Sequence, residues 1–181
     1  MKKVSMIAIF AFLLSCASTP DLNYYTLDMR ASRSGDGTVN LEVGRFTVSE
    51  KLDRHQIVIQ QSPTRLGYYA KDRWAASIGE MVEQKLATEF SGVDPEQRSL
   101  IVEGRIVAFE QVDAATGPVA RVGVEIVMRD GGAMRYEPPL LEKTYKVERT
   151  AESNSVDAVV QALSRAVEEI AAEIATDAAG L

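Results

Sequence analysis

The sequence predicts an α/β fold, a three-layer-like sandwich in which a mixed sheet of five or six strands packs against two long amphipathic helices. Two stretches carry apolar residues at spacings of three and four, which is typical of a helix with one buried face. Other stretches alternate apolar and polar residues, which is the pattern of a strand with one buried face. The composition, 46% hydrophobic and 25% charged over 181 residues, agrees with one folded domain.

The first sixteen residues have the pattern of a secretion signal that ends in a lipid-modified cysteine. Lys2 and Lys3 precede an uncharged apolar run over residues 6–14, which is shorter than the ~20 residues of a transmembrane helix. The run ends in Leu-Leu-Ser-Cys, and Cys16 is the only cysteine of the chain. This ending resembles the bacterial lipobox. The alternatives are an ordinary cleaved signal with an incidental cysteine, or a short buried apolar segment.

The resemblance to the lipobox implies a domain order and an anchor. Residues 1–15 are predicted to be removed as a signal peptide, and Cys16 to carry a diacylglycerol group and an N-acyl chain. Each buried methylene contributes about 0.8 kcal/mol, so three acyl chains make a stable anchor. Residues 16–23 then form the lipidated cysteine and a short tether, and residues 24–181 the folded domain. Ala17, where enterobacterial sorting to the inner membrane uses aspartate, favours the outer membrane by resemblance to that rule.

The amino-terminal half of the domain is predicted to contain four strands and one helix. Alternating or β-branched residues predict the strands. These lie at residues 24–27, 39–48, 57–59 and 66–69. A one-residue change of phase at Gly44 indicates a β-bulge, and the last two strands form a hairpin. A helix is predicted to open at residues 72–74, because Trp74 begins an apolar face with helical spacing, and to end before Gly92.

The carboxy-terminal half is predicted to contain a three-stranded antiparallel meander and a long helix. Its strands lie at residues 100–109, 119–129 and 141–147, with a loop at 111–118. The first of them is expected to be covered on both faces. The helix has the most regular apolar face, made of Val156, Val160, Leu163, Val167, Ile170 and Ile174. Asn154 and Asp157 resemble a capping box, and the apolar face is expected to pack on the sheet.

Catalytic, metal and nucleic-acid sites are not predicted. His55 is the only histidine and has no Gly-x-Ser-x-Gly nucleophile motif beside it in the chain, so we expect an exposed loop residue. One histidine and one cysteine do not make a zinc site. Without Lys2 and Lys3, the chain has 18 basic and 26 acidic residues, which gives a net charge of −8. This excess of acid argues against binding to nucleic acid and against electrostatic docking on anionic lipid.

Four tyrosines are candidate contacts for a partner protein. Tyr24 and Tyr25 lie in the first predicted strand, and Tyr68 and Tyr69 in the hairpin. Aromatic residues are enriched in interface cores, and an edge strand can accept a partner strand. The alternative is that these rings pack within the domain, as we also expect for Trp74.

Several weak motifs, taken in order, resemble one family. After the lipobox and tether come Tyr24-Tyr25-Thr26-Leu27, Leu41-Glu42-Val43, Leu52-Asp53-Arg54, Tyr68-Tyr69 and Arg73-Trp74-Ala75. In this order they resemble the ABC-type transport auxiliary lipoproteins over the whole mature chain. The resemblance implies a fold like the amino-terminal domain of TolB and a role without enzymatic activity.

The same resemblance implies a place and partners. The protein would be a membrane-anchored auxiliary subunit of an ABC system that transports lipid between membranes, on the periplasmic face of the outer membrane. Its implied partners are an MCE protein and the permease and ATPase of the transporter, and self-association into a ring is a further hypothesis. The alternative is a lipoprotein that activates a cell-wall synthesis or envelope-stress partner. Such regulators usually have a longer tether than residues 16–23.

Overall fold

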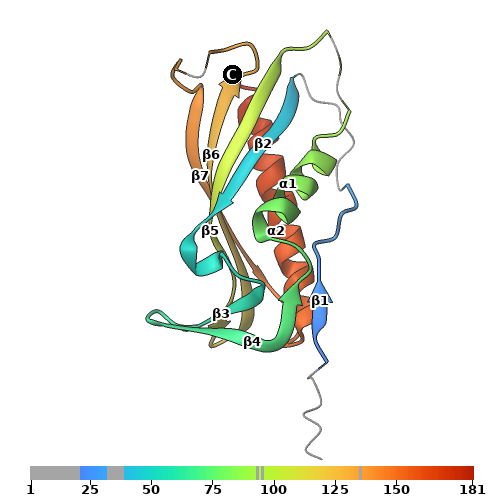
Figure 1. Ribbon diagram of the computed structural model, residues 1–181, viewed down its shortest axis with the longest axis vertical. Helices are drawn as coiled ribbons and strands as arrows, with labels where there is room; N and C mark the ends of the chain where they lie inside the picture. The colour runs from blue at the N-terminus through green and yellow to red at the C-terminus, as the bar shows by residue number, and fades with distance from the viewer. Residues whose placement is uncertain (1–20, 32–38, 93, 95, 135) are drawn as a thin grey trace, which may run out of the picture.

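The computed structural model describes residues 21–31, 39–92, 94, 96–134 and 136–181, in which one sheet packs against two helices (Figure 1). The strands are β1 (Asn23–Tyr25), β2 (Asn40–Val48), β3 (Gln56–Ser62), β4 (Arg65–Trp74), β5 (Ser99–Ala114), β6 (Gly117–Asp130) and β7 (Leu141–Thr150). The helices are α1 (Ile78–Glu89), α2 (Val156–Ala178) and the short 3₁₀ turn η2 (Glu50–Leu52). The predicted α/β class is confirmed. The sheet has seven strands, one for each predicted strand segment, which is more than the five or six expected for the sheet as a whole.

Strand β5 is the centre of the sheet and pairs along both of its edges. One edge takes β6 in antiparallel orientation, and β6 pairs in turn with β7. The other edge is shared, because β2 pairs in parallel with the first half of β5 and β3 with residues 110–112. β4 then pairs with β3, and β1 with the end of β4. The predicted meander and hairpin are confirmed. The predicted bulge is also present, as a shift of register between Val43 and Phe46.

Both helices cover the same face of the sheet, so the domain has two layers and not three. α1 contacts β2, α2 contacts β6 and β7, and the two helices contact each other. In β6, Val122, Val124 and Ile126 are buried, whereas Arg121 and Glu125 line hollows on the opposite face. We call this opposite face the outer face. The expectation that β5 is covered on both faces was therefore wrong, since neither α1 nor α2 lies over the outer face.

The first helix begins later than its apolar spacing predicted. Trp74 ends β4, and its fully buried ring meets that of Phe109 edge-on at a centroid distance of 5.4 Å. Ser77 is the N-cap of α1. Its hydroxyl oxygen accepts from the N–H of Glu80, whose carboxylate accepts from the N–H of Ser77. The spacing was misleading because Trp74 and Ile78 enter the same core from two different elements.

The last helix is confirmed, but with a different cap. The Ser155 hydroxyl oxygen accepts from the N–H of Ala158 at 3.2 Å, whereas the sequence favoured Asn154 and Asp157. All six predicted apolar positions belong to the core or pack against it. Which residue becomes the N-cap depends on where the chain changes from extended to helical geometry. Apolar spacing alone does not reveal that position.

The predicted loop at residues 111–118 is strand over most of its length. β5 continues to Ala114, and β6 begins at Gly117, so the two strands join through a tight turn. Gly117 has a φ of 119°, a conformation that favours glycine. Val112, which lies beyond the predicted strand end at residue 109, pairs with Val119. This segment is therefore strand because two long strands pair along it.

A buried ion cluster joins the two helices to the segment that follows β1. The Lys85 ammonium group donates to the carbonyl oxygen of Arg30 at 2.6 Å and lies 2.7 Å from Glu89 and 2.8 Å from Glu168. Burial by itself lowers the pKa of Lys85. The hydrogen bonds to Glu168 and Glu89 outweigh that effect and leave the pKa above its ordinary value.

Candidate interaction surfaces

The four candidate tyrosines divide by exposure. Tyr24 is 65% exposed and Tyr68 is 37% exposed, whereas Tyr25 and Tyr69 are partly buried against the core. Successive side chains of a strand point to opposite faces, so each Tyr-Tyr pair has one outward and one inward ring. The Tyr69 hydroxyl donates to Oε1 of Gln111 at 2.6 Å, and burial raises the pKa of both inward tyrosines. Tyr24 and Tyr68 are therefore the pair accessible to a partner.

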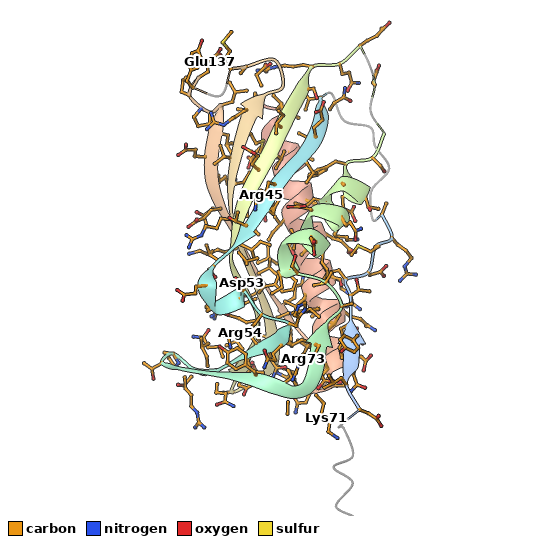
Figure 2. All side chains as sticks on the ribbon, viewed as in Figure 1. Arg45, Asp53, Arg54, Lys71, Arg73 and Glu137 are labelled. Carbon is orange, nitrogen blue, oxygen red and sulfur yellow. The ribbon has the colours of Figure 1, made fainter. Side chains whose placement is uncertain are left out.

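Both exposed tyrosines belong to what we call the amino-terminal end, formed by β1, the β3–β4 hairpin and residues 53–55 (Figure 2). Parallel pairing places Asn23 beside Asp72, and the Asn23 amide donates to the Asp72 carboxylate at 2.8 Å. The guanidinium of Arg54 lies 4.4 Å from the centroid of the Tyr68 ring, a cation–π contact. The sequence did not indicate this contact, because only the hairpin brings residues 53–55 against β4.

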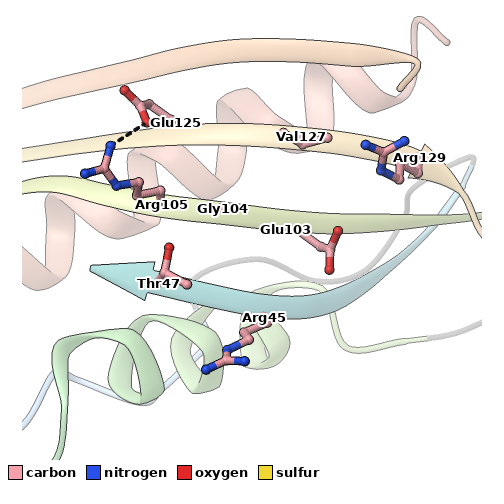
Figure 3. A pocket seen from close by; sticks show the side chains of 8 residues that line it. All are labelled: Arg45, Thr47, Glu103, Gly104, Arg105, Glu125, Val127 and Arg129. Atoms are coloured by element: carbon pink, nitrogen blue, oxygen red, sulfur yellow. Dashed lines mark ion pairs between the residues drawn. The ribbon is translucent and has the colours of Figure 1, made fainter. Parts of the chain in front are cut away.

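The outer face of the sheet carries charges of both signs. A hollow of about 340 Å³ lies over β2, β5 and β6 (Figure 3). It is lined by Arg45, Thr47, Glu103, Gly104, Arg105, Glu125, Val127 and Arg129. Arg105 lies 3.7 Å from Glu125, and Arg129 donates to the carbonyl oxygen of Glu137 at 2.7 Å. Because the hollow has charges of both signs, and several of them have partners within the protein, it does not favour an anionic or a cationic ligand.

A second hollow of about 420 Å³ on the same face surrounds a buried carboxylate. Glu110 is 2% exposed, with the ammonium of Lys51 at 2.8 Å and the guanidinium of Arg121 at 3.9 Å. Arg121 also lies 2.6 Å from Glu148 on β7. Two cations compensate the buried charge, so this cluster links β5, β6, β7 and η2 as a structural network.

The opposite end of the molecule exposes apolar side chains on the β6–β7 loop, residues 131–140. Met134 is 59% exposed, Tyr136 is 83% exposed and Leu140 is 42% exposed. The Tyr136 hydroxyl contacts the Met134 sulfur at 2.8 Å, and the N–H of Glu137 donates to the carbonyl oxygen of Met134 at 2.9 Å. Exposed aromatic and methionine side chains on an internally bonded loop suit a protein contact. The exposed apolar side chains of this loop were not predicted from the sequence, although its Met and Tyr were a usable signal.

Comparison with known families decides the identity of this domain. A model of the family described as the ABC-type transport auxiliary lipoprotein component matches residues 25–175. The chain belongs to this family. The resemblance seen in the sequence is thus confirmed over nearly the whole folded domain.

Solved structures support the fold of this auxiliary lipoprotein. The crystal structure of protein XCC0632 from Xanthomonas campestris is similar with a TM-score of 0.71 and 18% identity, covering 87% of this chain and 96% of that one. The crystal structure of an uncharacterized protein has a TM-score of 0.66 and 15% identity, covering 87% and 99%. At such identities the similarity shows the fold alone. No curated protein matches the sequence.

Among the residues that the structure describes, no three or more His, Cys, Asp or Glu side chains are grouped to hold a metal. None of the helices in those ranges is long and apolar enough to cross a membrane. His55 is exposed as predicted, and its carbonyl oxygen accepts from the N–H of Trp74 at 2.7 Å. Cys16, the predicted lipidation site, lies outside the described residues.

Proposed function

We propose that this auxiliary lipoprotein is a lipid-anchored, non-catalytic subunit of an ABC system that transports lipid between bacterial membranes. The family match over residues 25–175 is the observation that carries the proposal. The lipobox-like ending at Cys16 supplies the anchor, a diacylglycerol group and an N-acyl chain. The proposed partners are an MCE protein with its permease and ATPase, and the proposed place is the periplasmic face of the outer membrane.

The contacts of the outer face support a binding role in place of catalysis. A general acid or base needs a reacting group within reach and a proton that it can exchange. Glu110 is instead held between Lys51 and Arg121, and Arg105 lies beside Glu125. These charges stabilise the sheet and leave its two ends as the surfaces for partners.

We place the partner contact on the β6–β7 loop. Residues 16–20 span at most about 18 Å, which keeps the amino-terminal end close to the membrane that holds Cys16. The β6–β7 loop lies at the other end of the domain and offers Met134 and Tyr136 (Figure 1). Tyr24 and Tyr68 are the second candidate contact, for a partner that reaches the membrane surface.

Recovery of partners from the cell envelope tests the proposal. We expect the tagged full-length protein, purified from detergent-solubilised envelopes, to bring down an MCE protein, a permease and an ATPase, identified by mass spectrometry. Recovery of a cell-wall synthesis enzyme or an envelope-stress protein in their place would favour the regulatory alternative. Recovery of no other protein would contradict a stable transport complex.

Tyr136→Ala is expected to lower the recovery of the MCE protein about tenfold, because an aromatic anchor in an interface contributes on the order of 1.4 kcal/mol or more. Tyr24→Ala is the matched control, since Tyr24 is also strongly exposed but lies at the other end. Loss of the partner with Tyr24→Ala alone would move the contact to the amino-terminal end.

Cys16→Ser is expected to leave an unprocessed precursor that no longer fractionates with the outer membrane. The hydroxyl cannot replace the thiol that receives the diacylglycerol group, so neither lipidation nor cleavage follows. Membrane fractionation and the intact mass check the result, with Ser18→Ala in the tether as the control. Unchanged fractionation and mass would remove the anchor from the proposal.

A further inference from the structure

The segment of residues 53–74, which includes the β3–β4 hairpin, carries a net charge opposite to that of the rest of the chain. Its basic residues are Arg54, Arg65, Lys71 and Arg73, against the two acids Asp53 and Asp72, so residues 53–74 have a net charge of +2. Because the mature chain has a net charge of −8, its remaining residues carry −10. The acidic average, which argued against contact with anionic lipid, hides this local excess of positive charge.

The basic segment lies where the tether leaves the domain. Asn23 pairs with Asp72 in parallel strands, and Leu22 and Lys71 are the residues that directly precede this pair. Leu22 is 39% exposed, and Lys71 is exposed as well. Figure 2 shows Lys71 at this extremity of the molecule, with Arg54 and Arg73 in the same region. The point of attachment and the basic residues therefore share one end.

The same end exposes apolar side chains among its cations. Leu66 is 40% exposed, and Tyr68 carries the guanidinium of Arg54 over its ring. Within the described part of the chain, neither Arg65 nor Lys71 forms an ion pair, so their charges remain available. Tyrosine at headgroup level, with basic side chains reaching phosphates, is typical of a surface that rests on a bilayer.

We infer that the β3–β4 hairpin and residues 53–55 rest on the lipid headgroups of the membrane that holds the Cys16 anchor. Leu66 and Tyr68 lie at headgroup level, and Arg65 and Lys71 contact lipid phosphates. This inference rests on the anchor in the proposed function, because the short tether holds the surface near the lipid. Weak contacts then suffice, since the anchor raises their effective concentration. The contact orients the domain and directs the β6–β7 loop away from the membrane.

Quenching by brominated lipid tests the inference in the full lipidated protein, reconstituted in vesicles of phosphatidylethanolamine and phosphatidylglycerol. Leu66→Trp places a reporter in the hairpin, and Tyr136→Trp places one at the opposite end. The native Trp74 is fully buried, and the unsubstituted protein supplies its background. Acyl chains brominated near the headgroup should quench the added emission of Leu66→Trp about twofold, because interfacial side chains lie about 5–10 Å deep. The emission of Tyr136→Trp should not change.

Each other outcome has a distinct meaning. Unquenched Leu66→Trp in protein whose acylated Cys16 is verified by mass spectrometry would overturn the lipid contact and leave the anchor intact. The hairpin would then be free for a protein partner. Quenching of Tyr136→Trp alone would overturn the orientation. An unmodified Cys16 would overturn the anchor of the proposed function and this inference together.

The basic side chains are tested in the same assay. Arg65→Glu together with Lys71→Glu, introduced into the Leu66→Trp protein, should reduce the quenching at the hairpin. Arg105→Glu is the matched control, because Arg105 is 55% exposed but lies in the outer-face hollow. If the double charge reversal and Arg105→Glu leave the same quenching at the hairpin, the contact with lipid phosphates is overturned.

Discussion

Leu163→Glu is expected to unfold the domain. Leu163 lies in the middle of α2 and is 0% exposed, within the core that joins the helices to the sheet. The lost packing costs about 2–5 kcal/mol and the burial of a carboxylate costs more, against a total stability of about 5–15 kcal/mol for a typical domain. The measurement is the thermal transition of the purified protein by circular dichroism, which should lose its cooperativity.

The matched control for this variant is Gln161→Glu. Gln161 lies two positions earlier on α2 and is exposed, so the same charge should change the stability by less than about 0.5 kcal/mol. A cooperative transition of Leu163→Glu at the temperature of the unsubstituted protein would show that α2 does not form part of the core.

Lys85→Met is expected to lower the free energy of unfolding by about 3–5 kcal/mol, because it removes one partner of a buried ion pair. The side chains of Lys85 and Glu89 are both 0% exposed, and Glu168 is 24% exposed. Removing the ammonium group takes away the cation 2.7 Å from the Glu89 carboxylate and the donor to the Arg30 carbonyl oxygen. Urea unfolding followed by circular dichroism measures the loss.

The double variant Lys85→Met with Glu89→Leu is the control for this prediction. It should recover most of the stability, since apolar residues can replace a buried ion pair at little cost. Full stability of the single variant would contradict a buried cluster. The cluster also has a pH dependence, because the pKa of Lys85 is raised. Its contribution is complete below the ordinary pKa of 10.5 and falls as the pH rises through the higher folded-state value.

The candidate surfaces could be predicted only in part. The paired tyrosines were visible in the sequence, but alternation in a strand does not say which ring of each pair points outward until the covered face is known. The structure leaves Tyr24 and Tyr68 exposed. The contact of Arg54 with Tyr68 and the apolar side chains of the β6–β7 loop were not predicted, because exposure in a loop depends on what packs around it.

The sequence by itself determined the parts of this protein that depend on local order. The apolar period of α2, the meander and the bulge near Gly44 follow from neighbouring residues, and the family follows from motifs in sequence. Only the tertiary structure decided that both helices cover one face of the sheet and that Trp74 ends a strand. It also decided that β5 and β6 extend into the segment predicted as a loop. Those features depend on which surfaces remain to be buried after the strands have paired, and no local pattern contains that information.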